Sequence, residues 1–170
     1  MLTGSAASET AFRRAAPTRR VIHLATYGVL NKQNPLFSFV DLAEDRLHDG
    51  RLDVHEVFGL RLVADLVVLS ACQTALASGS LGDVPAGDDW VGLSRAFLTA
   101  GARSVVASLW PVQDQATATL MVQFYTRYIP GADPRDALAG AQRAMLAVPS
   151  TAHPYYWAGF EAIGGRSRGD

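Results

Sequence analysis

The one cysteine of the 170-residue chain, Cys72, stands where a short apolar run turns abruptly polar. The run is Leu66–Leu69, L-V-V-L, and only Ser70 and an alanine separate it from the thiol. An apolar run of this length without alternation is typical of a strand covered on both faces in a parallel sheet. The carboxyl ends of such strands form the crevice in which α/β proteins bind ligands, so Cys72 is a candidate nucleophile. The alternative is a small buried hydrophobe, as many free cysteines are.

A second candidate group follows the first predicted strand, which covers residues 21–26. Tyr27 and Gly28 come next and are predicted to form a turn into a loop. Side chains alternate along a strand, so His23 and Tyr27 share one face. A histidine inside a strand is expected to be structural rather than a ligand. Right-handed crossovers place the ends of the two strands, at Tyr27 and Cys72, at the same edge of the sheet.

The remaining pattern alternates strands with helices, which predicts an α/β fold with a mostly parallel sheet. Residues 75–89 have no clear pattern, and their position directly after Cys72 favours a segment that lines a site. Asp88 and Asp89 within it either cap the following helix or face a substrate. The predicted helices cover residues 5–16, 52–60 (capped by Asp53), 90–100, 115–129 (capped by Asp114) and 134–148, and the further strands cover residues 36–42, 103–109 and 160–163.

The composition, with 49% hydrophobic and 18% charged residues, is that of a single globular domain, here with a polar tail at residues 165–170. A net charge of -1 gives no reason to expect nucleic acid or a membrane surface as a partner. One cysteine cannot form an internal disulfide, and the sequence has neither a membrane span nor a signal-peptide core, so a cytoplasmic location is expected. Phosphate-cradling motifs are missing and the four histidines are scattered, so we expect no cofactor and no metal.

Six motifs follow one another between residues 4 and 164. They are H-L-A-T-Y-G (23–28), D-L-V-V-L-S-A-C-Q-T (65–74), G-D-D-W-V-G-L-S-R-A-F-L-T-A-G-A (87–102), S-V-V-A-S-L-W-P-V-Q-D (104–114), A-L-A-G-A-Q (137–142) and H-P-Y-Y-W-A-G-F (153–160). Together they resemble the C-terminal portion of the CHAT domain, the bacterial branch of the caspase- and separase-like cysteine peptidases. The resemblance implies a caspase-like three-layer α/β/α sandwich and a cysteine endopeptidase activity.

The resemblance supports Cys72 as the nucleophile, because in the family a thiolate attacks the peptide carbonyl with an imidazole as its general base. The position of the family's catalytic histidine is occupied here by Tyr27. A phenol in water holds its proton until about pH 10, so Tyr27 cannot accept the thiol proton at neutral pH. His23 lies four residues back along the strand, about 13 Å from Tyr27, and is out of hydrogen-bond reach of that position.

The resemblance also implies roles for other residues. Gly28 would belong to the loop beside the oxyanion, and His23 and Ser70 would support the site. Asp88 and Asp114 match residues that shape the substrate pocket, and an acidic pocket would favour a basic residue before the scissile bond.

Three functions are compatible with these observations. The first is a degenerate peptidase that keeps the fold and Cys72 but has lost catalysis, or nearly so. The second is an active cysteine endopeptidase with a non-standard base. The third is a non-enzymatic module that binds a protein or peptide through residues 75–89 or through an exposed sheet edge. A flavodoxin-like binder of small molecules fits the pattern of elements but not the motifs.

The start of the chain departs from the family pattern, in which a further strand and helices lie upstream. We therefore expect a partial domain that lacks the N-terminal part of the full one. One edge of its sheet would be unpaired, and copies of the chain could associate there to form a homo-oligomer.

Overall fold

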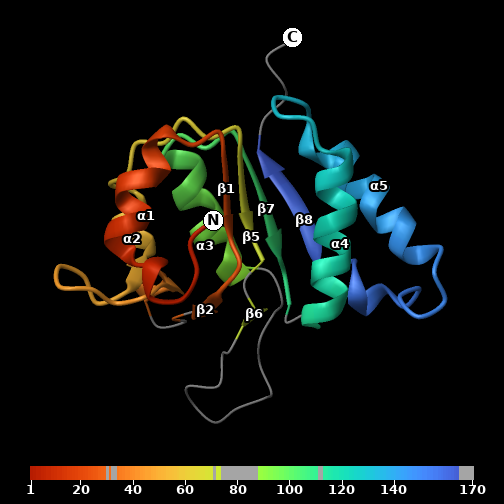
Figure 1. Cartoon of the computed structure of the whole chain (residues 1–170), viewed down its shortest axis with the longest axis horizontal. Coiled ribbons are helices and arrows are strands. Elements are labelled where there is room, and N and C mark those ends of the chain that lie inside the picture. Colours follow the sequence, from red (N-terminus) through yellow and green to blue (C-terminus); the bar gives the residue numbers. More distant parts are fainter. Residues whose placement is uncertain (30, 32–33, 71, 74–87, 111–112, 165–170) are drawn as a thin grey trace.

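A mostly parallel four-stranded sheet runs through the centre of the molecule (Figure 1). The computed structural model describes residues 1–29, 31, 34–70, 72–73, 88–110 and 113–164, with residues 72–73 and 88–91 described by their backbone alone. The strand order is β1-β5-β7-β8, and β8 alone runs antiparallel to its neighbour. The predicted mostly parallel sheet is thus confirmed. Its strands are β1 (Val21–Leu24), β5 (Leu66–Leu69), β7 (Ser104–Ser108) and β8 (Phe160–Gly164).

Both faces of the central strand β5 are buried, as its continuous apolar run predicts. Val67 and Leu69 belong to the hydrophobic core on one face of the sheet, and Leu66 and Val68 belong to the core on the other. All four side chains are completely inaccessible to solvent. This alternation across the sheet is the reason that the run contains no polar residue.

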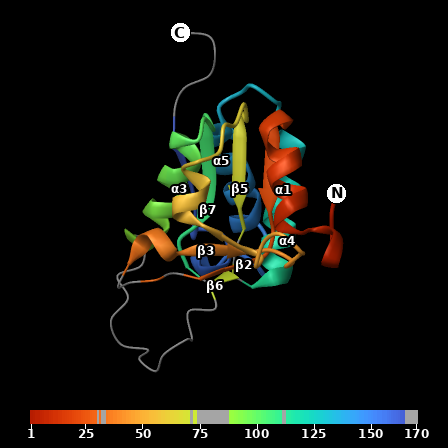
Figure 2. The same cartoon turned by 90° about the vertical axis from the view of Figure 1, so that its left-hand side faces the viewer.

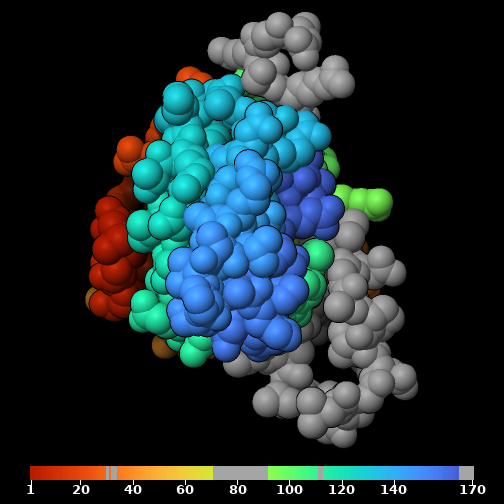
Figure 3. Space-filling model, turned by 90° about the vertical axis from the view of Figure 1, so that its right-hand side faces the viewer, coloured from red at the N-terminus to blue at the C-terminus, as the bar shows by residue number. Residues whose placement is uncertain are grey.

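Helices cover both faces of the sheet and give the molecule three layers. One layer holds α1 (Glu9–Ala15), α2 (Val54–Val57) and α3 (Asp88–Thr99), and the other holds α4 (Asp114–Arg127) and α5 (Pro134–Leu146). Figure 3 shows α4 and α5 side by side over their face. The predicted α/β/α architecture is therefore correct. Within the described ranges, no helix has both the length and the apolar character needed to cross a membrane.

A second, smaller sheet lies beyond one end of the first (Figure 2). Its strands are β4 (Arg51–Asp53), β3 (Phe39–Asp41), β2 (Tyr27–Val29) and β6 (Cys72–Gln73), in that order across the sheet. The turn predicted at Tyr27 and Gly28 is therefore wrong, because both residues lie in β2. A strand of two or three residues is too short to show a hydrophobic period, so only its pairing partners define it.

Several helix boundaries differ from the prediction. The helix expected from residue 5 begins at Glu9, because the Oγ of Ser8 accepts a hydrogen bond from the N–H of Ala11 and caps it there. Asp114 is the first residue of α4 and not its cap, a position taken by Gln113. Asp53 caps α2 as predicted, although this helix ends at Val57. Short 3-10 helices occupy Gly4–Ala6, Ala16–Thr18, Pro35–Phe37 and Pro154–Tyr156.

Candidate active site

The two candidate catalytic positions are opposite each other in adjacent strands. In the parallel register of β2 and β6, Tyr27 pairs with Cys72 and Gly28 pairs with Gln73. Neighbouring strands lie about 4.8 Å apart, so no other segment separates the two main chains. The expectation that Tyr27 and Cys72 meet at one edge is confirmed, and the two positions prove to be direct strand neighbours.

The chain passes from the first sheet to the second twice, once after β1 and once after β5, and these two crossings are side by side. Leu24 is opposite Leu69 at the end of β1 and β5, and Tyr27 is opposite Cys72 at the start of β2 and β6. Two residues separate the strands in each chain, so the register is the same before and after the crossing. The N–H of Ser70 donates a 3.1 Å hydrogen bond to the carbonyl of Leu24 where the crossing begins.

Tyr27 presents its side chain to solvent, with 54% of the residue exposed. The phenol therefore stands at an open position and is not part of the packed core. The thiol of Cys72 lies outside the described side chains, so its position is known from the register of its backbone.

His23 is held on both sides of its ring by hydroxyl groups. Its Nε2 lies 2.6 Å from the Oγ of Ser70, and its Nδ1 lies 3.0 Å from the hydroxyl of Tyr125 on α4. Burial of the ring lowers the pKa of His23 from its usual 6.5, so the imidazole is neutral at pH 7. The expectation of a structural histidine agrees with these two contacts.

The other three histidines also lie in the described part of the chain, and each is engaged with local neighbours. Their Nδ1 atoms lie 3.0 Å from the hydroxyl of Thr10 (His48), 3.3 Å from the carbonyl oxygen of Leu36 (His55) and 3.2 Å from the N–H of Tyr155 (His153). None of the four histidines belongs to β2 or β6. The register therefore places a tyrosine, and no histidine, opposite Cys72.

The predicted supporting residues fall on regular elements. Gly28 is buried in β2, between Val40 of β3 and Gln73 of β6. Asp88 and Asp114 are the first residues of α3 and α4, and the chain order puts both helix starts at the edge where the parallel strands end. Asp114 is exposed at this edge. The side chain of Asp88 lies outside the described side chains.

Sequence reasoning missed two residues that shape this region. Tyr125 lies in α4, where 36% of it is exposed and its hydroxyl contacts His23. Trp110 follows β7, where its Nε1–H donates a 3.3 Å hydrogen bond to the carbonyl of Tyr155. The sequence Trp-Pro predicts that the strand before it ends, but it does not predict which residues the indole contacts.

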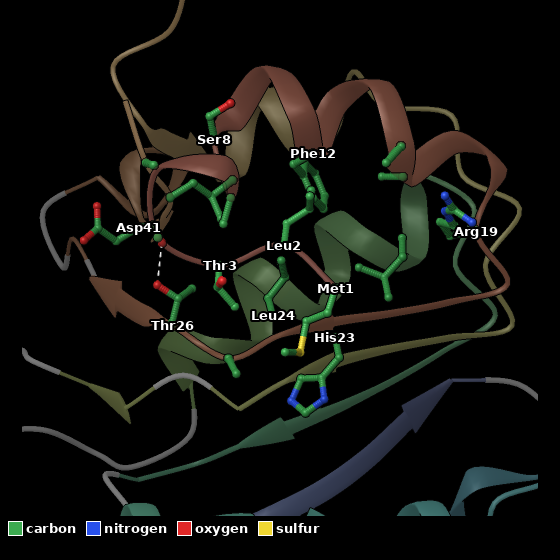
Figure 4. Close-up of a pocket in the computed structure, with 18 of the residues that line it drawn as sticks. Met1, Leu2, Thr3, Ser8, Phe12, Arg19, His23, Leu24, Thr26 and Asp41 are labelled. Atoms are coloured by element: carbon green, nitrogen blue, oxygen red, sulfur yellow. Dashed lines mark hydrogen bonds between the residues drawn. The ribbon is translucent and has the colours of Figure 1, made fainter. Parts of the chain in front are cut away.

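A pocket of about 730 Å³ lies elsewhere, along the free edge of β1. Figure 4 shows Phe12 of α1 and Leu24 of β1 facing it, with Arg19 at one end and Asp41 at the other. The N-terminal residues Met1 and Leu2 also line it, and Leu2 remains half exposed. Apolar side chains therefore flank a strand edge that has no partner strand in the described part of the chain.

These features define a caspase-like α/β domain with a cysteine position at the carboxyl edge of its sheet. The chain belongs to the CHAT domain family, whose sequence model matches residues 1–165. Over 118 residues, 69% of this chain, it is 38% identical to tetratricopeptide repeat protein 28 of Mus musculus. Over a stretch of the same length it is 34% identical to the protein of that name from Homo sapiens. The chain spans only 5% and 4% of the length of these two relatives, both of which are mammalian.

Proposed function

We propose that this CHAT domain is a degenerate cysteine peptidase, which keeps the nucleophile Cys72 and the peptide-binding edge but has lost the base. The observation that carries the proposal is the register pair of Tyr27 and Cys72. In the family this pair would be an imidazole and a thiol, and here the first member is an exposed phenol. A protein or peptide would be bound and cleaved very slowly or not at all.

The chemistry sets the size of the loss. A free thiol with a pKa near 8.5 is a few per cent thiolate at pH 7, and the removal of a positioned base costs a factor of roughly 10² to 10⁴ in rate. The acidic residues Asp88 and Asp114 support a preference for a basic residue before the scissile bond. Gly28 would line the oxyanion side. We place the domain in the cytoplasm, with no cofactor or metal in the mechanism.

The test uses the single cysteine as its own reporter. The alkylation rate of Cys72 by iodoacetamide is measured against pH in the wild type and in Tyr27→His, with Cys72→Ala as the blank. We expect an apparent thiol pKa near 8.5 in the wild type, and a clearly lower value in Tyr27→His. Cleavage of a basic peptide should appear in Tyr27→His only. Wild-type cleavage that disappears in Cys72→Ala would reveal an active peptidase with another base and overturn the proposal.

A second candidate function, a protein-interaction module, is favoured by the edge of β1. The carbonyls of Arg20 and Leu24 face β5, so in the alternating pattern of a parallel ladder the peptide groups of Val21, His23 and Ala25 face outward. Such an edge pairs with an extended segment. The simplest occupant is β1 of a second copy. Both mammalian relatives are named for tetratricopeptide repeats, a class of repeat that presents extended binding surfaces, which also fits an interaction role.

Sedimentation of the wild type against Ala25→Lys tests this second candidate. A lysine at the exposed edge should abolish self-association, because a charge there cannot enter a continuous sheet. Ala132→Lys, at an exposed turn before α5, is the matched control and should associate like the wild type. A wild type that is monomeric at every concentration rules out the second copy as the occupant.

A further inference from the structure

Side chains from three parts of the fold meet at His23, close to the point where the chain passes from the first sheet to the second. The imidazole comes from β1, the hydroxyl at 2.6 Å from Ser70 directly after β5, and the hydroxyl at 3.0 Å from Tyr125 of α4. The rings of His23 and Tyr125 also pack at a centroid distance of 5.6 Å. In Figure 4 the imidazole points away from Phe12 and Leu24, to the opposite side of the strand. Although its ring points to that side, His23 is also one of the residues that line the pocket beside α1.

Both ring nitrogens are satisfied while the imidazole is neutral. One nitrogen then donates a hydrogen bond through its N–H and the other accepts a hydrogen bond, and a hydroxyl group can serve as partner in either case. Ser70 is buried, with 8% exposed, and Tyr125 keeps its proton, because burial raises its pKa to about 12. No charged side chain among the described residues hydrogen-bonds to this chain of three groups. It is a neutral clamp between β1, β5 and α4.

The clamp holds the chain at Ser70, the first residue after β5, where the crossing begins. Ser70 is bound to β1 twice, by its N–H to the carbonyl of Leu24 and by its Oγ to His23. Only one residue separates Ser70 from Cys72, and an extended chain advances about 3.3 Å per residue. A shift of the backbone at Ser70 would therefore also shift Cys72 and would disrupt the pairing of Cys72 with Tyr27.

We propose that His23 is a positioning residue of the thiol site, which acts through Ser70 to hold Cys72 in register with position 27. This inference rests on the proposed function, since it assigns to His23 a task at the proposed thiol site. Tyr125 sets the ring orientation, so α4 is coupled to the site as well.

Two substitutions of His23 distinguish the loss of its hydrogen bond to Ser70 from a general loss of packing. The amide of His23→Gln reaches the position of Nε2 and can keep the bond to Ser70, whereas the shorter amide of His23→Asn reaches only the position of Nδ1. Ser70→Ala removes the same bond from the other side. His55→Asn, at an exposed histidine of α2, is the control.

Amide hydrogen exchange of the full chain is the first readout. We expect His23→Asn and Ser70→Ala to raise exchange in β2 and β6 by about tenfold while β7 and β8 keep wild-type protection, because the loss is a local opening. His23→Gln and His55→Asn should match the wild type. Unchanged exchange in β2 and β6, or an equal rise in all strands, would overturn the positioning role.

The thiol provides a second readout. In the Tyr27→His background, His23→Asn should return the apparent pKa of Cys72 toward that of a free thiol, and His23→Gln should not. If Tyr27→His alone leaves the thiol unchanged, the proposed function fails, and the exchange experiment still decides the role of His23. A low thiol pKa that survives His23→Asn would contradict the clamp directly.

Discussion

Gly159 lies directly against the indole of Trp110, so that a Cβ at position 159 would come within 2.8 Å of the ring carbon Cε2. The carbonyl of the same glycine accepts a 2.7 Å hydrogen bond from the N–H of Leu109. These contacts join the end of β7 to the chain that enters β8, at the carboxyl edge of the sheet. The indole can lie flat there only because position 159 has no side chain.

Gly159→Ala is therefore expected to destabilise the domain by about 1–3 kcal/mol, the usual cost of an extra methyl group in a packed site. Urea unfolding followed by tryptophan fluorescence measures the change. Gly92→Ala in α3 is the control, because no described atom lies within 4 Å of its added Cβ, and alanine favours a helix. A loss of stability no larger than that of the control would show that the indole moves aside freely.

A second prediction concerns the buried carboxylate of Glu9, which is 1% exposed in α1. Arg13 bridges it to Glu56 of α2, with nitrogen–oxygen distances of 2.7 Å and 2.6 Å. Arg13→Met leaves the Glu9 charge without its guanidinium, which should cost roughly 3 kcal/mol of unfolding free energy.

The double variant Glu9→Gln, Arg13→Met is the informative comparison. It removes the buried charge together with its partner, so it should be more stable than Arg13→Met alone. The same urea titration measures both. A double variant as unstable as the sum of its single variants would mean that the two side chains do not interact in the folded protein.

A third prediction concerns pH. Burial lowers the pKa of His23 below 6.5, so the unfolded chain binds a proton that the folded chain does not bind in the interval between the two values. Stability attributable to this group is complete above pH 6.5 and is lost as the pH falls from there through the folded pKa. His23→Gln should flatten the fall of the unfolding midpoint between about pH 7 and pH 5. Parallel curves for the two proteins would refute the assignment.

Much of the first sheet and of the helices that cover it is predictable from sequence, because each prediction depends on residues close together in the chain. Leu66–Leu69 is apolar throughout since both faces of β5 are covered, and Asp133 with Pro134 marks the start of α5 as predicted. Leu120 and Phe124 are four residues apart within the predicted helix, as side chains on one helix face must be, and both are buried in α4. In each case the residues of the helix or strand itself form the pattern that predicts it.

The second sheet is not predictable in this way, because β2 and β6 are defined by what they pair with. Tyr27 and Gly28 have the composition of a turn, and only their pairing with β3 and β6 makes them a strand. The same limit applies to His23. Its hydrogen-bond partner Tyr125 is far away in the sequence and belongs to α4, a helix that covers one face of the first sheet. Long-range contacts between single residues leave no periodic trace in a sequence.

The unchanged register across the two sheets has an evolutionary consequence. Main-chain pairing aligns positions 27 and 72, so the alignment does not depend on which side chains occupy them. A histidine codon and a tyrosine codon differ by a single base. On the proposed function, one point mutation at position 27 would therefore switch such a domain between cleaving and merely holding a polypeptide, without a change of the scaffold in either direction.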